Sequence, residues 1–336
     1  MRARDLKLGT RILVTGGAGF IGSHLCQRLV ALGLDVICLD DLSTGRIDYI
    51  SDLLKKPNFK FVKGNLLQNK TVKKALADVD VVYHLAAKVG VKRYVEDPIG
   101  VIRTNVHGTE NLLEAALRVG VERFIFASTS EVYGKNLNMP LKEDSNRVLG
   151  PPTIDRWCYS SSKALDEHLC NAYYRQYKLP IVILRYFNIY GPRQETSDYG
   201  GVVSIFIRRV LRNQPPLVHG KGTQTRSFTY VSDAVDATVQ AAASKKAIGE
   251  TFNIGNSRET TINELARLAV RLAGKSGKLK PRHIPYENFY GAWYEDVPRR
   301  VPDATKARRI LGFKPRVSLE EGLRKTIEWY RKYAFS

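Results

Sequence analysis

The sequence has no long apolar run, few cysteines and none of the short motifs that hold metals or activate nucleophiles. No apolar stretch approaches the roughly 18 residues of a membrane span, and the densest, Ile181–Leu184, has the length of a strand. The segment Met1–Lys7 is too charged for a signal peptide. The 4 cysteines form no CxxC pair, which excludes a disulfide framework or a zinc site. We therefore expect a soluble, cytoplasmic protein that binds no metal and no membrane.

Acidic residues are the scarcer charge. The chain has 33 aspartates and glutamates against 53 lysines and arginines, a formal net charge of +20. This excess favours an anionic partner. The basic residues are dispersed, no basic block alternates with aromatic residues, and no zinc-finger or RNA-recognition signature occurs, so we expect no nucleic-acid binding. Arginines that clamp a small diphosphate ligand are the better interpretation.

The first half of the chain alternates short β-branched runs with amphipathic stretches. With 336 residues, the chain can bury one large core or two modest ones. Strands are predicted at 11–15, 36–39, 59–62, 81–85, 124–127 and 181–184, and helices at 20–32, 101–119 and 157–177. This order predicts an α/β fold, a Rossmann-type doubly wound parallel sheet with helices on both faces.

The punctuation of the chain changes after residue 190, where glycine and proline pairs divide it into shorter pieces. Helices are predicted at 203–213, 261–273 and 319–333, with mostly loop between 275 and 303. We expect a smaller α/β C-terminal lobe that binds the substrate. The division is approximate, residues 1–190 and 191–336, and the chain can cross between the two parts.

A glycine-rich turn follows the first predicted strand and opens the first predicted helix. Gly16, Gly19 and Gly22 leave room for a pyrophosphate to approach the backbone at the positive end of the helix. Asp40 ends the second strand 18 residues after Gly22, where a carboxylate can accept hydrogen bonds from a ribose. Because a carboxylate repels a 2′-phosphate, the pattern predicts NAD rather than NADP. The alternative is that the glycines serve packing alone and Asp40 caps a turn.

Tyr159 and Lys163 are four residues apart on a predicted helix, so their side chains project from one face. To act as a base, a phenol with a pKa of ~10 needs that pKa lowered by about 3 units, which takes about 4 kcal/mol. A neighbouring ammonium and an oxidised nicotinamide ring can supply this. The hydroxyls of Ser128–Ser130 follow a strand, at the sheet edge where ligands of α/β proteins bind.

Seven ordered motifs resemble one family. They are Thr15-Gly-Gly-Ala-Gly-Phe-Ile-Gly22, His84-Leu-Ala-Ala87, Ser128-Thr-Ser-Glu-Val-Tyr-Gly134, Tyr159-Ser-Ser-Ser-Lys163, Arg185–Arg193, Gln224–Asp233 and Arg300-Val-Pro-Asp303. By these the chain resembles the extended short-chain dehydrogenase/reductases, and among them the NAD-dependent nucleotide-sugar (UDP-sugar) epimerases and decarboxylases. The resemblance covers essentially the whole chain.

The resemblance implies a role for each matching residue. Tyr159 would take the proton of a sugar hydroxyl and Lys163 would hold the nicotinamide ribose, with Thr129, Ser130 and Glu131 completing the catalytic group. The NAD site would be lined by Gly16, Gly19, Phe20, Ile21, Gly22, Asp40, Ser43, Thr44, Gly45, Asn65, Leu66, Ala86, Ala87, Asn105, Tyr159 and Lys163. Asn65 replaces an aspartate common in the family, and its amide oxygen can still accept from adenine. The UDP-sugar would be held by Lys92, Asn188, Val202, Val203, Arg226 and Arg300.

The resemblance implies transient oxidation of the sugar at C4 by tightly bound NAD, and two outcomes stay open. Glu131 favours a UDP-glucuronate decarboxylase forming UDP-xylose, because it matches the decarboxylase motif; alternatively, it caps a backbone amide. Gly90-Val91-Lys92 resembles the Gly-Val-Arg of uronate 4-epimerases, with Lys92 as a weaker substitute for arginine, and the Tyr159–Lys163 motif looks more like the epimerase version. The prediction is a UDP-sugar 4-epimerase, acting on UDP-glucose/UDP-galactose or UDP-glucuronate/UDP-galacturonate. A non-catalytic NAD-binding sensor is the remote alternative, since such proteins usually lack the tyrosine and lysine.

The quaternary structure is also implied by the resemblance. The predicted helices at 101–119 and 157–177 match those that form a four-helix bundle between subunits in this family. We therefore expect a homodimer.

Overall fold

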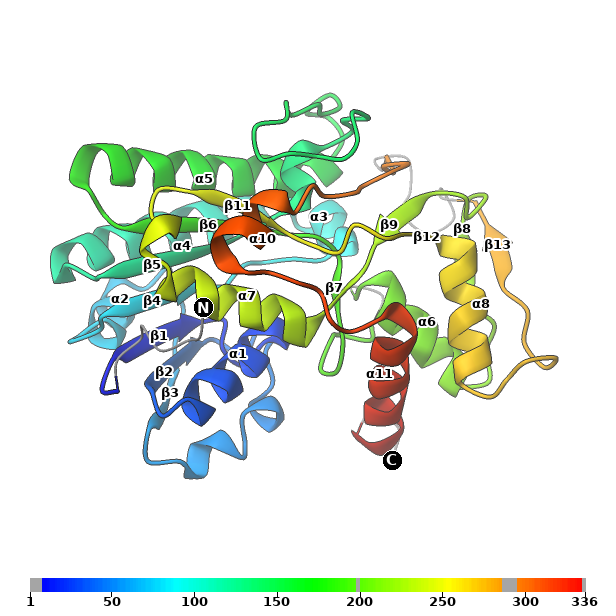
Figure 1. The fold of residues 1–336 in the computed structure, drawn as a ribbon, viewed down its shortest axis with the longest axis horizontal. Coiled ribbons are helices and arrows are strands. Elements are labelled where there is room, and N and C mark those ends of the chain that lie inside the picture. Colours follow the sequence, from blue (N-terminus) through cyan, green and yellow to red (C-terminus); the bar gives the residue numbers. More distant parts are fainter. Residues whose placement is uncertain (1–7, 198–199, 286–294, 334–336) are drawn as a thin grey trace.

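A computed structural model describes residues 8–197, 200–285 and 295–333, except for the side chains of Val91 and Lys92. The chain forms a large parallel sheet between two layers of helices, with a smaller group of helices and short strands beside it (Figure 1). The predicted Rossmann-type α/β fold is confirmed. No helix in the described ranges is long and apolar enough to cross a bilayer.

The large sheet has 7 strands in the order β11-β6-β5-β4-β1-β2-β3, and every neighbouring pair is parallel. The order reverses between β1 and β4, which is where α/β sheets of this kind bind ligands. The strands are β1 Arg11–Thr15, β2 Asp35–Asp40, β3 Phe59–Lys63, β4 Val81–His84, β5 Arg123–Thr129, β6 Ile181–Tyr186 and β11 Thr251–Ile254.

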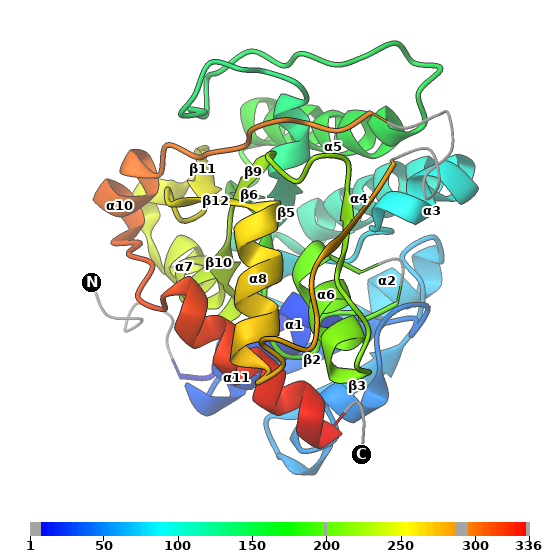
Figure 2. The same ribbon diagram turned by 90° about the vertical axis from the view of Figure 1, so that its right-hand side faces the viewer.

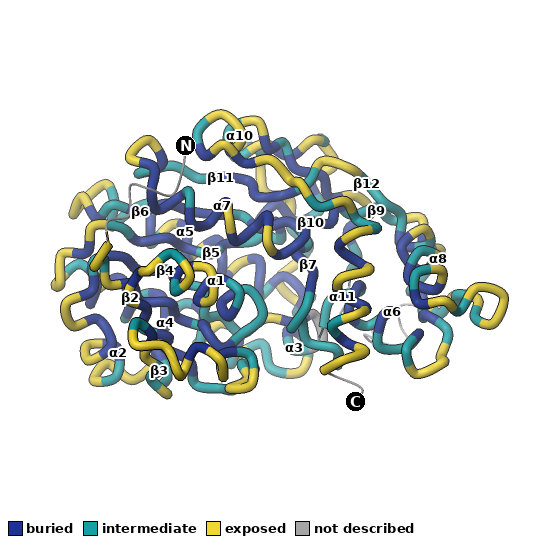
Figure 3. The backbone as a smooth tube through the Cα atoms, turned by 60° about the horizontal axis from the view of Figure 1, so that its bottom comes forward, coloured by how far each residue is buried: buried dark blue, intermediate teal, exposed yellow. Residues whose placement is uncertain are grey.

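Helices cover both faces of this sheet. On one face lie α1 (Phe20–Ala31) and α7 (Val231–Ala243), and on the other lie α2 (Asn69–Ala75), α4 (Pro98–Val119) and α5 (Arg156–Tyr177). The strands alternate between the two layers, because Ile12 and Val14 enter one apolar core cluster and Leu13 enters the other. Figure 3 shows the buried strands at the centre of the molecule.

The ends of α4 follow local sequence signals. Asp97 is its N-cap and accepts a hydrogen bond from Gly100 N at 2.9 Å, and Pro98 occupies the first helical position. Gly120 ends the helix in the left-handed conformation at φ 75°. The short helix α3 (Val91–Glu96) precedes it, so the segment between β4 and α4 is tightly folded.

The smaller part contains α6 (Val202–Leu211), α8 (Ile262–Leu272) and α11 (Leu319–Tyr333), which pack on one another (Figure 2). Three short strand pairs accompany it: β7 Ile189–Tyr190 with β10 Thr229–Tyr230, β9 Thr225–Ser227 with β12 Glu259–Thr261, and, beside α8, β8 Leu217–His219 with β13 Arg282–Ile284. Helix α10 (Thr305–Leu311) lies against β11. The predicted helices at 203–213, 261–273 and 319–333 correspond to α6, α8 and α11.

The sequence reasoning missed two elements of the large sheet region that follow residue 190. Helix α7 is buried nearly all round, so it lacks the polar stripe by which an amphipathic helix is recognised, and β11 is only 4 residues long. Both elements lie in the large sheet region, so the chain crosses back over the predicted division. The division near residue 190 itself stays a prediction. The described residues between 275 and 303 are mostly loop, as predicted, apart from the 3-residue strand β13, and residues 286–294 lie outside the described residues.

Candidate active site

The glycine turn lies at the carboxyl end of β1 and has no room for side chains at Gly16 and Gly22. Gly16 has φ 70°, and a Cβ there would lie 2.8 Å from Ala86 N. A Cβ on Gly22 would lie 2.1 Å from Gly16 O. At Gly19, the N-cap of α1, the nearest atom to a Cβ is 3.2 Å away, and no side chain caps the helix. The free amides of the first turn therefore face an open approach, which fits a pyrophosphate.

Asp40 supports the turn from the end of β2. Its carboxylate accepts hydrogen bonds from Ala18 N and Leu42 N, each at 2.9 Å, and burial raises its pKa. A Cβ on Gly45 would lie 2.7 Å from Asp40 Oδ1, so the loop of residues 43–45 closes over the acid. These contacts hold Asp40 between the glycine turn and the loop of residues 43–45. The three together form the predicted nucleoside end of the site.

Asn65 lies next to this region but its amide is engaged locally. Its Nδ2 donates to Asp41 Oδ2 at 2.8 Å, and its Oδ1 accepts from Leu67 N at 2.9 Å. The oxygen expected to accept from adenine therefore already has one partner. A carbonyl oxygen has two lone pairs, so a role for Asn65 in the NAD site stays a prediction.

The segment after β4 is fixed against the glycine turn by buried polar groups. Thr15 Oγ1 bonds His84 Nδ1 at 2.8 Å and accepts from Ala86 N at 3.3 Å. Asn105, buried on α4, accepts from Lys88 N at 2.8 Å and donates to Ser162 Oγ at 3.1 Å. The predicted cofactor residues of β1, β4 and α4 thus meet beside the first turns of α5.

Tyr159 and Lys163 project from α5 into the same region. The phenol ring of Tyr159 stacks on Tyr94 from α3, with centroids 4.6 Å apart and planes at 7°. Burial and the charge of Glu131 raise the pKa of Tyr159, and a hydrogen bond with Thr129 opposes them. The stacked ring and the Thr129 hydroxyl place the phenol at the end of β5, as the sequence predicts.

Lys163 is paired with an acid. Sequence reasoning expects it to lower the pKa of Tyr159 together with an oxidised nicotinamide ring; in the protein alone its Nζ lies 3.5 Å from Asp166 Oδ2, one turn further along α5. The ammonium is also 3.9 Å from the centre of the Phe126 ring. In the protein alone the Asp166 charge offsets that of Lys163, and burial lowers the pKa of Lys163 itself. In the protein alone, burial and the charges of Glu131 and Asp166 raise the pKa of Tyr159, and its lowering beside bound NAD stays a prediction.

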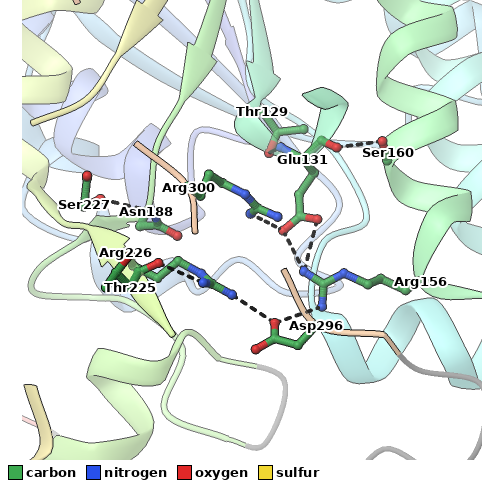
Figure 4. Close-up of polar contacts among 10 residues, drawn as sticks. All are labelled: Thr129, Glu131, Arg156, Ser160, Asn188, Thr225, Arg226, Ser227, Asp296 and Arg300. Atoms are coloured by element: carbon green, nitrogen blue, oxygen red, sulfur yellow. Dashed lines mark hydrogen bonds and ion pairs between the residues drawn. The ribbon is translucent and has the colours of Figure 1, made fainter. Parts of the chain in front are cut away.

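A buried cluster of charges follows β5, where η4 (Ser130–Tyr133) begins (Figure 4). Glu131 Oε1 lies 2.6 Å from Arg300 Nη1, and its Oε2 lies 3.3 Å from Arg156 Nη2. Asp296 lies 2.9 Å from Arg226 and 3.8 Å from Arg156. Three arginines thus share two acids, and the cluster carries a net positive charge.

Glu131 is the centre of this cluster. Burial would raise its pKa, but Arg300 and Arg156 outweigh burial and hold the pKa at about 2. Its backbone amide is capped by the Thr129 hydroxyl at 3.1 Å. The alternative that the Glu131 side chain caps a backbone amide is therefore wrong, because its carboxylate binds guanidinium groups instead. Ser130 is buried, and its neighbour Ser160 donates to Glu131 O at 2.7 Å.

Arg300 has spare hydrogen-bonding capacity. It is 3% exposed, and within the described ranges its Nε and Nη2 have no hydrogen-bond partner. Buried guanidinium donors without acceptors are costly, so they indicate an anionic ligand. Asn188, at φ 43°, donates to Ser227 O at 3.1 Å beside Arg226, which brings these predicted UDP residues together.

Other predicted substrate residues are less well placed. Val202 and Val203 begin α6, and Val203 is buried in the core. The side chain of Lys92 lies outside the described residues. The sequence reasoning also missed Arg156, Asp296, Tyr94 and Asp166; of these, only Asp166 carried a sequence signal, its position three residues after Lys163 on the same helix.

Comparisons with known proteins agree with this geometry. The model of the NAD dependent epimerase/dehydratase family matches residues 12–255. The chain is 45% identical over 322 residues to the UDP-N-acetyl-alpha-D-glucosaminuronate decarboxylase of Bacillus cytotoxicus, covering 96% of this chain and 98% of that one.

Solved structures give the same family. The UDP-glucose 4-epimerase of Thermotoga maritima, solved with UDP-glucose, is 35% identical with a TM-score of 0.87, covering 97% of this chain and 100% of that one. The UDP-glucuronic acid 4-epimerase of Bacillus cereus, solved with UDP-glucuronic acid and NAD, is 34% identical with a TM-score of 0.86, covering 96% and 99%. The cofactor is NAD, as predicted. The chain belongs to the NAD dependent epimerase/dehydratase family, within the extended short-chain dehydrogenase/reductases.

Proposed function

We propose that the protein is a UDP-uronate decarboxylase: it oxidises C4 of a UDP-hexuronic acid and releases the C6 carboxylate as carbon dioxide. The observation that carries the proposal is the buried Glu131, held ionised by Arg300 and Arg156 beside Thr129. The relative with 45% identity over nearly the full length is a decarboxylase of a UDP-hexuronic acid, which supports the same reaction. The motifs alone favoured the epimerase, and the Glu131 cluster shifts the balance.

The roles of the residues follow from their positions. Bound NAD supplies the oxidation of the sugar and its reversal. Tyr159 accepts the proton of the C4 hydroxyl, and the Thr129 hydroxyl, which interacts with the phenol, orients it. Lys163 contributes positive charge that stabilises the phenolate of Tyr159, the form that accepts this proton and becomes the neutral phenol. We assign the diphosphate to Arg226 and Arg300, with Asn188 beside them; the buried Arg300 and the Asn188–Ser227 hydrogen bond support this assignment.

Decarboxylation follows from the chemistry of the C4 ketone. A C4 ketone makes the C6 carboxylate that of a β-keto acid, so the C5–C6 bond can break with its electron pair passing into the C4 enolate. Arg300 and Arg156 hold Glu131 as an anion. The proposal requires the substrate carboxylate to lie against Glu131 rather than against the arginines, because a neighbouring negative charge destabilises a carboxylate but not neutral carbon dioxide. Protonation at C5 then restores the ketone, and its reduction gives a UDP-pentose.

A second candidate is the 4-epimerase acting on the same class of substrate. It shares the oxidation at C4, but the ketone is then reduced from its opposite face. The TM-score of 0.86 to a UDP-glucuronic acid 4-epimerase favours it, together with the Tyr159-Ser-Ser-Ser-Lys163 motif.

Product analysis separates the candidates. The purified protein is incubated with UDP-glucuronate, UDP-N-acetylglucosaminuronate or UDP-glucose, without added NAD, and the products are identified by NMR. We expect a nucleotide sugar without the C6 carboxylate from at least one uronate. A C4 epimer that keeps its carboxylate would establish the epimerase instead. Turnover that survives Tyr159→Phe unchanged would refute both mechanisms.

Two variants then test the observation that carries the proposal. Glu131→Gln keeps the size of the side chain but removes its charge, and we expect decarboxylation to fall at least a hundredfold. The matched control is Glu320→Gln on α11, because Glu320 is also bound by two arginines, Arg271 at 2.8 Å and Arg324 at 2.7 Å, but on the exposed surface. Decarboxylation by the control should equal that of the unaltered protein.

A further inference from the structure

A buried acid beside the proposed catalytic pair has no role in the mechanism above. Asp166 lies on α5, three residues after Lys163, and is 0% exposed. Its Oδ2 is 3.5 Å from Lys163 Nζ, and the Thr109 hydroxyl is near enough to lower its pKa, but neither oxygen has a partner at full hydrogen-bond geometry in the described part of the chain. Burying an ionised carboxylate with so few partners is costly, so its presence calls for a function.

Polar groups connect the surroundings of Asp166 to the glycine turn. Thr109 on α4 interacts with the Asp166 carboxyl, and its hydroxyl meets His84 Nε2 at 3.0 Å. The other ring nitrogen of His84 meets Thr15 Oγ1 at 2.8 Å, at the start of the turn. The ring of His84 is neutral, because burial and the charge of Lys163 lower its pKa. The acid therefore belongs to a fixed row of buried groups beneath the cofactor site.

We propose that Asp166 is a positioning residue: it holds the Lys163 ammonium, offsets its charge, and so sets the pH range in which Tyr159 and Lys163 work as a pair. The inference rests on the proposed function, because it takes these two residues as the reacting base and its cationic partner. Asp166 itself touches neither substrate nor cofactor in this scheme and acts through Lys163.

Among the charged groups around Tyr159 and Lys163, Asp166 is the one placed to offset the charge of the lysine. The ionisable groups that face Lys163, Asp166 and Tyr159 come from β4, α3, η4 and α5, and they are His84, Tyr94, Glu131, Glu167 and Cys170. Glu167 is paired with Arg185 at 2.6 Å, and Glu131 is paired with Arg300. Burial raises the pKa of Cys170, which keeps that thiol neutral. Asp166 is the acid in contact with the lysine.

The size of the effect follows from distance. Tyr159 and Asp166 are seven residues apart on α5, which is about 10 Å at a rise of about 1.5 Å per residue. At an effective dielectric constant of about 20, a charge at about 10 Å shifts a pKa by about one unit. Removing the negative charge lets Tyr159 lose its proton at lower pH, and it also releases the proton of Lys163 at lower pH.

The first test is the pH profile of kcat/KM for the holoenzyme on the UDP-uronate that it converts. In Asp166→Asn the acid limb should move by about one unit to lower pH, which is about a tenfold gain in relative rate there, and the alkaline limb should move further, because Lys163 lies only 3.5 Å from the acid. Cys170→Ala, a buried change one turn further along α5, should leave the profile where it is. A purely structural role predicts a rate reduced by the same factor at every pH.

The second test needs no turnover. Burial raises the pKa of Asp166 to about 6 in the folded protein. A raised carboxyl pKa means that the folded state holds the proton more tightly, so its stabilising contribution is complete below the unfolded pKa of about 4 and is lost as the pH rises through about 6. The Tm of the unaltered protein should therefore fall relative to that of Asp166→Asn between pH 4 and 6, and the difference should be constant above pH 7.

A second variant guards against a folding defect. Thr109→Val keeps both charges but removes a hydroxyl that lowers the pKa of Asp166, so the acid stays protonated to higher pH. Its profile should shift in the same direction as that of Asp166→Asn, by a smaller amount. Unshifted profiles in both variants would overturn the inference. If Tyr159→Phe stays active, the proposed function fails instead; if Tyr159→Phe is inactive and the profiles do not move, only the role of Asp166 is refuted.

Discussion

Replacing Glu131 by glutamine tests whether the charge cluster is an ionised network. The two arginines hold the pKa of Glu131 at about 2, against an ordinary value of 4.5. At about 1.4 kcal/mol per pKa unit, the ionised carboxylate stabilises the folded protein by about 3 kcal/mol at neutral pH. Because the pKa is lowered, this contribution is complete above pH 4.5 and is lost as the pH falls through about 2.

The assay is urea unfolding of both proteins at pH 7 and pH 3. At pH 7, Glu131→Gln should unfold with a free energy about 3 kcal/mol lower, since it leaves two buried arginines without their acid. At pH 3 the unaltered protein has lost more than half of the contribution, so the difference should shrink to about 1 kcal/mol. Equal differences at the two pH values would show that packing, rather than charge, stabilises this site, and no difference at pH 7 would refute the ion pairing.

Three further predictions concern the cofactor turn, the stacked tyrosine and the subunit contact. Gly22→Ala should lower the Tm and abolish copurified NAD, since its Cβ would lie 2.1 Å from Gly16 O. Gly19→Ala, whose Cβ has its nearest contact at 3.2 Å, should keep the Tm and lose only NAD affinity. Equal Tm values for the two variants would contradict the geometry. Tyr94→Ala should reduce kcat about tenfold or more with little change in KM, because it removes the ring stacked 4.6 Å from the phenol, and Tyr94→Phe should restore kcat. The homodimer stays a prediction, and Ile102 on α4 and Leu165 on α5, each nearly half exposed, lie on the two helices expected to form the contact. Replacing both by glutamate should convert a dimer into a monomer, as measured by light scattering. If the unaltered protein is already a monomer, the prediction is wrong.

The sequence by itself determined the fold class, the glycine turn of the cofactor site and the pair of Tyr159 and Lys163. Continuous short apolar runs such as Ile12–Val14 and the helical stripe of α4 are local signals, and the spacing of Gly16, Gly19 and Gly22 is that of a turn with no room for side chains at Gly16 and Gly22. Tyr159 and Lys163 are also a local pair, four residues apart on one helix. These features could be read without coordinates because neighbours along the chain create them.

Only the tertiary structure decided which charges meet. Glu131 and Arg300 are 169 residues apart, and no pattern in the chain places that arginine on that acid or adds Arg156 to the pair. Local reasoning gave Lys163 the task of lowering the pKa of Tyr159, but a pKa depends on burial and on every nearby charge, and here Asp166 offsets the lysine. Helix α7 and β11 escaped for a related reason, since elements buried on all sides show no contrast between an inner and an outer face.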